Sequence, residues 1–98
     1  MSIDIVTFRG LIEKNIDFQL ERDNLANMHT IFEELRPAIA NRESAIFGYI
    51  VGFLISSAWQ LVHTVAKRTL TQEEIHEVTS IILRRGLEIR SKIMETST

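Results

Sequence analysis

Apolar residues recur at intervals of three and four positions along almost the whole chain, and alternation with a period of two never persists. This spacing places apolar side chains on one face of an α-helix, whereas a half-buried strand requires strict alternation. We therefore predict an all-α fold, a small up-and-down bundle of about four helices that forms a single domain over residues 1–98. The expected helices cover residues 3–21, 24–40, 42–68 and 72–95.

Each of the first two expected helices carries one apolar row. In the first helix the row consists of Ile5, Phe8, Ile12, Ile16 and Leu20. In the second it consists of Leu25, Met28, Phe32, Leu35 and Ile39. Ser2 and Asp23 are the expected N-caps, and Pro37 should kink or end the second helix because proline removes a backbone donor. The polar residues 21–24 favour a break between the two, although one continuous helix also fits the pattern.

The third expected helix is apolar around most of its circumference. No row of residues along it is polar over its first four turns, and it contains the pair Gly48-x-x-x-Gly52. Such a helix is typical of a buried, central element. A membrane-spanning helix over residues 44–63 is the alternative, since a span needs roughly 20 apolar residues. We expect a soluble, cytoplasmic protein, because the N-terminal residues lack the pattern of a secretory signal.

Three amphipathic neighbours of ordinary width are too narrow to cover this central helix. They would leave Ile46, Ile50 and an aromatic surface in water, a larger apolar patch than monomers usually expose. A second copy of the chain, related by a two-fold axis, is the simplest cover. The residues expected at this oligomer interface are Gly48, Tyr49, Gly52, Phe53, Ile55, Trp59 and Val62. In the alternative, all of these residues are internal core of a compact monomeric bundle.

The fourth expected helix begins with the most specific local signal in the chain. Thr71 and Glu74 have the spacing of a capping box, in which each side chain bonds the other residue's backbone amide. Beyond it, one row is entirely polar and another is expected to face the core. The expected inner row is Ile75, Thr79, Ile82, Gly86, Ile89 and Ile93. Gly86 in this row suggests close approach of another backbone.

Candidate chemistry is sparse. The chain has no cysteine, which excludes disulfides, thiolate metal sites and cysteine nucleophiles. All four glycines fall within expected helices, so no phosphate-binding loop is predicted. Glu73-x-x-His76 matches half of a di-iron carboxylate signature, but the second pair is absent. His63 lies near Lys67 in a five-residue stretch that resembles the phosphorylated helix of histidine phosphotransfer domains. We expect no catalytic residues, no cofactor and no metal site.

The charge balance argues against a general nucleic-acid binder. There are 11 Lys and Arg residues against 13 Asp and Glu residues, a formal net charge of -2, whereas such proteins need a basic surface. A modest basic patch of Arg84, Arg85, Arg90 and Lys92 keeps open a small DNA-binding regulator. Our expectation is a non-catalytic interaction module, an adaptor, regulator or assembly factor that works as a homodimer or higher oligomer and binds another protein. The DNA-binding regulator and a membrane-associated protein using residues 44–63 are the alternatives.

Overall fold

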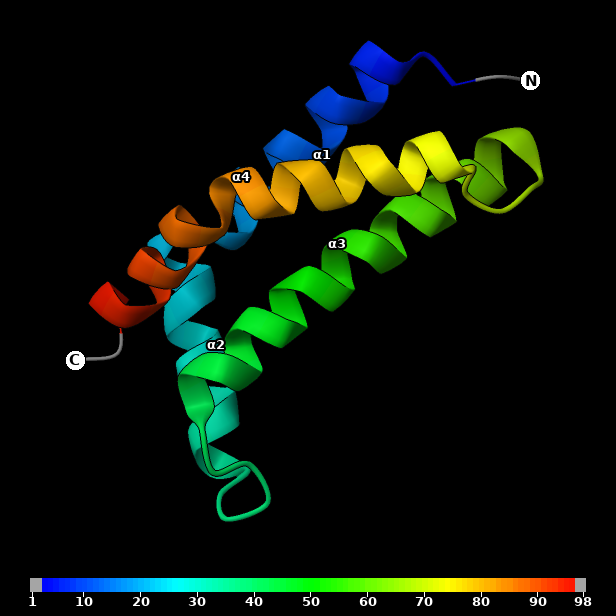
Figure 1. The fold of residues 1–98 in the computed structure, drawn as a ribbon. Coiled ribbons are helices and arrows are strands. Elements are labelled where there is room, and N and C mark those ends of the chain that lie inside the picture. The colour runs from blue at the N-terminus through cyan, green and yellow to red at the C-terminus, as the bar shows by residue number, and fades with distance from the viewer. Residues whose placement is uncertain (1–2, 97–98) are drawn as a thin grey trace.

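The computed structural model describes residues 3–96, and within them it contains four helices and no strand (Figure 1). Of the described residues, 83% are helical, so the predicted all-α bundle is confirmed. The helices are α1 (Ile5–Gln19), α2 (Arg22–Glu34), α3 (Arg42–Ala66) and α4 (Gln72–Thr96).

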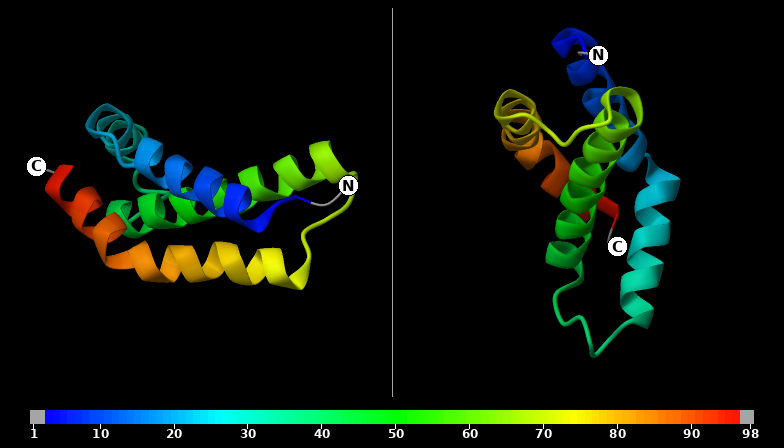
Figure 2. Two further views of the ribbon diagram at one scale, coloured as in Figure 1. Left: turned by 90° about the horizontal axis from the view of Figure 1, so that it is seen from above. Right: turned by 90° about the vertical axis from the view of Figure 1, so that its right-hand side faces the viewer.

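The path of the chain differs from a simple up-and-down bundle. The chain reverses direction between α2 and α3 and again between α3 and α4, but between α1 and α2 it bends without reversing (Figures 1 and 2). The right-hand view of Figure 2 shows α3 in the middle, with α4 on one side and α2 on the other. α3 packs most extensively against α4. The result is an elongated molecule of 44 × 24 × 20 Å.

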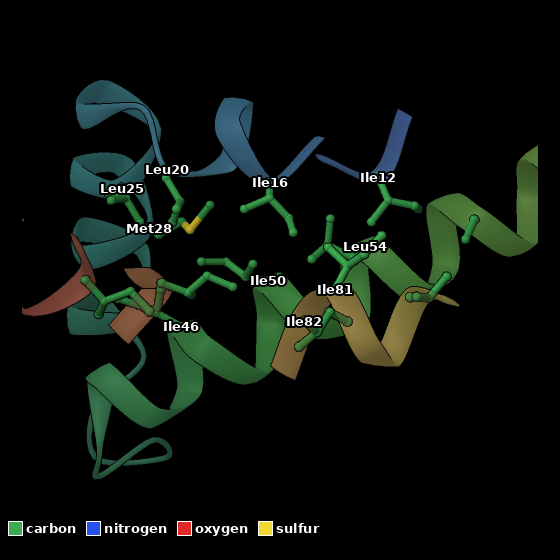
Figure 3. Close-up of a cluster of buried hydrophobic side chains, with 14 of the residues drawn as sticks. Ile12, Ile16, Leu20, Leu25, Met28, Ile46, Ile50, Leu54, Ile81 and Ile82 are labelled. Carbon is green, nitrogen blue, oxygen red and sulfur yellow. The ribbon is translucent and has the colours of Figure 1, made fainter. Parts of the chain in front are cut away.

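One row of α3, with a residue at every fourth position, forms the centre of the core. Its members are Ile46, Ile50, Leu54, Ala58 and Val62, all of them buried. Isoleucines of α1 and α4 close around this row, including Ile12, Ile16, Ile81 and Ile82 (Figure 3). The expectation that Ile46 and Ile50 would lie in water is therefore wrong. The neighbouring helices bury the row that contains them and leave other apolar rows of α3 outside.

The two N-terminal helices confirm the predicted break and correct the predicted caps. α1 begins at Ile5, and the Asp4 carboxylate caps it by accepting a hydrogen bond from the Thr7 amide at 3.2 Å. Ser2, the expected cap, lies outside the described residues. α2 begins at Arg22 with Glu21 in the N-cap position, so Asp23 lies in its first turn and is not the cap. The predicted apolar row of α1 is confirmed in its buried members, Phe8, Ile12, Ile16 and Leu20.

α2 is shorter than predicted. It ends at Glu34, whereas the pattern suggested residue 40. Pro37 cannot donate a backbone hydrogen bond, and residues 35–38 form turns instead. Leu35, expected in the buried row, is consequently exposed, while Leu25 and Met28 remain in the core. His29 joins α2 to the end of α4, because its Nε2 donates to the Ile93 carbonyl at 2.9 Å.

The capping box of α4 is confirmed at both of its hydrogen bonds. The Glu74 amide donates to Thr71 Oγ1 at 3.1 Å, and the Thr71 amide donates to the Glu74 carboxylate at 2.9 Å. Arg68, just after α3, binds both oxygens of the same carboxylate at 2.8 and 3.1 Å. Before it, Lys67 ends α3 in the left-handed conformation with a φ of 56°. Glu74 therefore fixes the connection between the two longest helices.

Candidate interaction surface

Six of the seven residues predicted at an oligomer interface lie on the exposed side of α3. Gly48, Tyr49, Gly52, Phe53, Ile55 and Trp59 are all exposed. Val62 is the exception, because it is fully buried in the subunit's own core. The alternative in which the whole set forms the interior of a monomeric bundle is therefore wrong for the folded subunit.

The structure divides these exposed residues between two sides of α3. Gly48, Gly52, Ile55 and Trp59 follow one another by four, three and four residues, so they share one side of the helix. Tyr49 and Phe53 lie on the other side. α4 and α2 flank α3 on opposite sides (Figure 2), and the contact of Tyr49 with Phe32 places the second group next to α2.

The side next to α2 is aromatic. The ring of Tyr49 meets Phe32 of α2 edge-on, with 6.1 Å between ring centroids, and it lies equally close to Phe53. Phe18 and Ile31 join Tyr49 and Phe53 around a shallow surface hollow. Part of the aromatic surface predicted for oligomerisation is therefore already in contact with the chain's own second helix.

On the side next to α4, the single tryptophan is held in place by the chain itself. The indole Nε1 of Trp59 donates to Thr69 Oγ1 at 3.0 Å. The Trp59 ring stacks on His63, with centroids 5.4 Å apart and an angle of 3° between the planes. These contacts fix the orientation of the ring while leaving 45% of the residue exposed. Trp59 is therefore a pre-organised apolar surface whose polar atom is already satisfied.

α4 contributes two exposed residues to the same side that the sequence analysis missed. Leu83 and Leu87 are 81% and 82% exposed. They share a side of α4 with Arg90, whose guanidinium lies 5.6 Å from the ring centroid of Phe47 on α3. Leu83 and Leu87 therefore lie on the exposed side of α4 from which Arg90 reaches Phe47 of α3. A leucine pair four residues apart, outside both rows assigned to this helix, was the sequence signal for them.

The predicted inner row of α4 is partly wrong. Ile82, Ile89 and Ile93 are buried as expected, but Ile75 and Thr79 are exposed. The buried row also contains Val78 and Ile81. A Cβ added to Gly86 would meet nothing within 4 Å, so this glycine is not a close-approach point inside the subunit. The helix is rotated relative to the prediction, so that Val78 and Ile81 take the place of Ile75 and Thr79 in the buried row.

Two basic residues of α4, Arg84 and Arg85, form ion pairs that mostly join α4 to α1. Arg84 pairs with Glu13, while Arg85 binds Glu13 at 3.0 Å, Asp17 at 2.7 Å and Glu88 at 2.8 Å. The hydrogen bond from Arg84, with a smaller effect of Arg85, lowers the pKa of Glu13 below its ordinary value.

The two other members of the predicted basic patch lie apart from this network. Lys92 is 3.9 Å from Glu95, and Arg90 covers Phe47. The predicted patch of four basic residues is thus interleaved with carboxylates and does not form one continuous basic surface.

The histidines lie apart from any cluster of metal-ligating side chains within the described residues. Within residues 3–96, no three Asp, Glu or His side chains are grouped closely enough to hold a metal ion. His76 lies 3.4 Å from the Ser80 hydroxyl, one turn along α4. His63 is engaged in the stack with Trp59.

The fold defines a small all-α bundle, and the exposed side chains define an apolar surface on it. Comparison with protein-family models, with curated proteins and with solved structures finds no match to this chain. The function must therefore be argued from the surface itself.

Proposed function

We propose that this protein is a non-catalytic helical interaction module that works as a homo-oligomer, in the role of an adaptor, a regulator or an assembly factor. The observation that carries the proposal is the exposed, uncharged side of α3. From Ser44 to Ala66 the helix has no Asp, Glu, Lys or Arg, and its aromatic and aliphatic residues nevertheless reach the surface.

A surface of this kind favours association because it is costly in water. Exposed apolar surface contributes roughly 25 cal/mol per Å² when it is removed from solvent. Monomeric proteins rarely leave a continuous patch larger than a few hundred Å² uncovered, and larger patches mark interaction sites. The charged residues of the described chain lie off this side of α3, several of them in ion pairs between α1 and α4, so they give this surface little protection from association.

The oligomeric state provides the direct test. Size-exclusion chromatography with light scattering at micromolar concentration should give a mass of at least twice the 11.3 kDa of the chain. A single species with the mass of one chain under these conditions would contradict the proposal.

Membrane association is supported by a separate observation. α3 is long and apolar enough to cross a membrane by length and composition alone, a property that core helices of soluble proteins share. Insertion would separate its buried row from the isoleucines of α1 and α4. The soluble module is the better-supported proposal because that row already has partners. Flotation with lipid vesicles distinguishes the two.

The DNA-binding alternative leads to a further prediction. Because carboxylates pair with Arg84 and Arg85, we expect no retardation of a duplex DNA in a mobility-shift assay at physiological salt. Retardation that weakens steeply as salt is raised, and that is lost when both arginines are replaced by glutamine, would support the regulator instead. If this protein does not bind DNA, the same double replacement should change only its free energy of unfolding.

A further inference from the structure

We propose that the self-association surface is a two-helix face. In it, Leu83 and Leu87 of each copy pack against the glycine-lined side of α3 in the other copy. We call this surface the α3–α4 face and define it by its residues, which are Gly48, Gly52, Ile55, Trp59, Leu83, Gly86 and Leu87. The inference rests on the proposed homo-oligomer and names the residues through which it forms.

The two leucines form the raised part of the face. At more than 80% exposure, they are the two most exposed large apolar residues of the described chain. They lie one turn apart on α4, on the side that Arg90 turns toward Phe47. Within the described residues no other element covers them appreciably, since each keeps more than 80% of its surface exposed.

The glycines of α3 and α4 form the low part of the proposed face. α3 and α4 lie side by side (Figure 2). A Cβ built on Gly48, Gly52 or Gly86 would meet nothing within 4 Å, so no neighbour in the subunit fills the space above these glycines. A face with both a ridge and a low surface is self-complementary. When two copies are related by a two-fold axis, the ridge of each packs against the low surface of the other.

Charge indicates which partner suits the face. Arg84 and Arg85 are turned toward α1, and Glu77 is bound there by Arg9 at 2.6 Å. Arg90 is the one charged residue on the leucine side of α4 between Ile75 and Arg90, and its guanidinium lies over Phe47. A nucleic acid or a charged peptide would find no complementary charges here. A second copy presents an equally uncharged surface.

The size of the face fits a small dimer interface. Along α3 from Gly48 to Trp59 it is about 17 Å long, from a rise of 1.5 Å per residue, and two adjacent helices are about 20 Å wide. Specific interfaces bury about 800 Å² of accessible surface per partner, and weaker ones bury less. The raised leucines enlarge the accessible area of the face above this projected area.

Replacing both leucines by glutamine tests the inference. Glutamine is a good helix former, and both positions are exposed, so the subunit should keep its fold. Because each chain contributes both residues to a two-fold interface, we expect the dissociation constant to rise more than about 100-fold. The measurement is sedimentation equilibrium, with circular dichroism to verify the helix content. Leu11→Gln on α1, also at an exposed leucine, is the matched control and should leave association unchanged.

Two of the glycines provide an independent test of the same face. Gly10→Ala and Gly52→Ala both add a methyl group where nothing in the subunit opposes it. Both should therefore leave the fold intact, but we expect only Gly52→Ala to raise the dissociation constant, by about tenfold or more.

The outcomes separate this inference from the proposed function. A monomeric wild-type protein contradicts both the proposed homo-oligomer and the α3–α4 face. The same holds for a monomer that uses Leu83 and Leu87 to bind vesicles of phosphatidylcholine and phosphatidylglycerol. A wild-type oligomer that survives the double leucine replacement overturns the α3–α4 face alone. So does an oligomer that Leu11→Gln disrupts equally.

Discussion

Replacing Leu54 by alanine should lower the free energy of unfolding by about 3 kcal/mol, within the range of about 2–5 kcal/mol measured for leucine truncation in protein cores. Leu54 is fully buried at the middle of the α3 row, where α1 and α4 both approach (Figure 3). Loss of three buried carbon atoms removes their transfer free energy and leaves a cavity that helices fixed on several sides cannot close. Urea unfolding at a single protein concentration is the measurement, because association would make stability depend on concentration.

The control for this prediction lies on the same helix. Ser56 is exposed and carries no charge, so Ser56→Ala should change the free energy of unfolding by less than about 0.5 kcal/mol. Equal effects at the two positions would mean that the α3 row centred on Leu54 is not the core.

Replacing Glu74 by glutamine should lower the free energy of unfolding by about 2 kcal/mol at pH 7. The hydrogen bonds from Arg68, assisted by the Thr71 amide, hold the pKa of the buried Glu74 carboxyl at about 2, against an ordinary value of 4.5. Glutamine keeps a side-chain oxygen for the capping bond but loses the charge that Arg68 binds. The expected loss of unfolding free energy is smaller than the full pKa shift of Glu74 would give, because Arg68 is partly exposed and screened by water.

The pH dependence of this difference has a definite sign. A carboxyl whose pKa is lowered on folding stabilises the protein fully above the unfolded value, and the contribution is lost as pH falls toward the folded value. The difference in unfolding free energy between wild type and Glu74→Gln should therefore narrow as pH falls from about 4.5 to about 2. Glu95→Gln, at an exposed carboxylate, should show almost no gap at pH 7. A gap for Glu74→Gln that stays constant over this pH range would show that the charge of Glu74 contributes little.

Local signals in the sequence predicted the helices well and some of their ends poorly. The period of three and four residues is a property of each segment alone, so it indicated four helices and the break near residue 21. Thr71 and Glu74 stabilise each other within one turn, and their capping box was predictable for the same reason. The caps of α1 and α2 were not, because several adjacent polar residues could serve.

Predicting the interaction surface required knowing which rows the subunit buries. α3 is apolar on most sides, so its sequence does not single out the row that faces α1 and α4. This is why Ile46, Ile50 and Val62 were placed outside the core, whereas Gly48, Gly52, Ile55 and Trp59, predicted at an oligomer interface, are exposed in the subunit. The basic patch failed for a related reason. Glu13 and Asp17, its partners, are about 70 residues away along the chain.

The sequence by itself determined that the chain is all helical, where α4 begins, and that α3 has more apolar surface than its neighbours cover. These properties depend on residues within a few turns of each other. The tertiary structure decided which side of each helix is buried, that Leu83 and Leu87 of α4 stay exposed, and that Arg84 and Arg85 of α4 pair with carboxylates of α1. Those outcomes depend on the rotation of each helix about its axis, which is set by packing between side chains from distant parts of the chain.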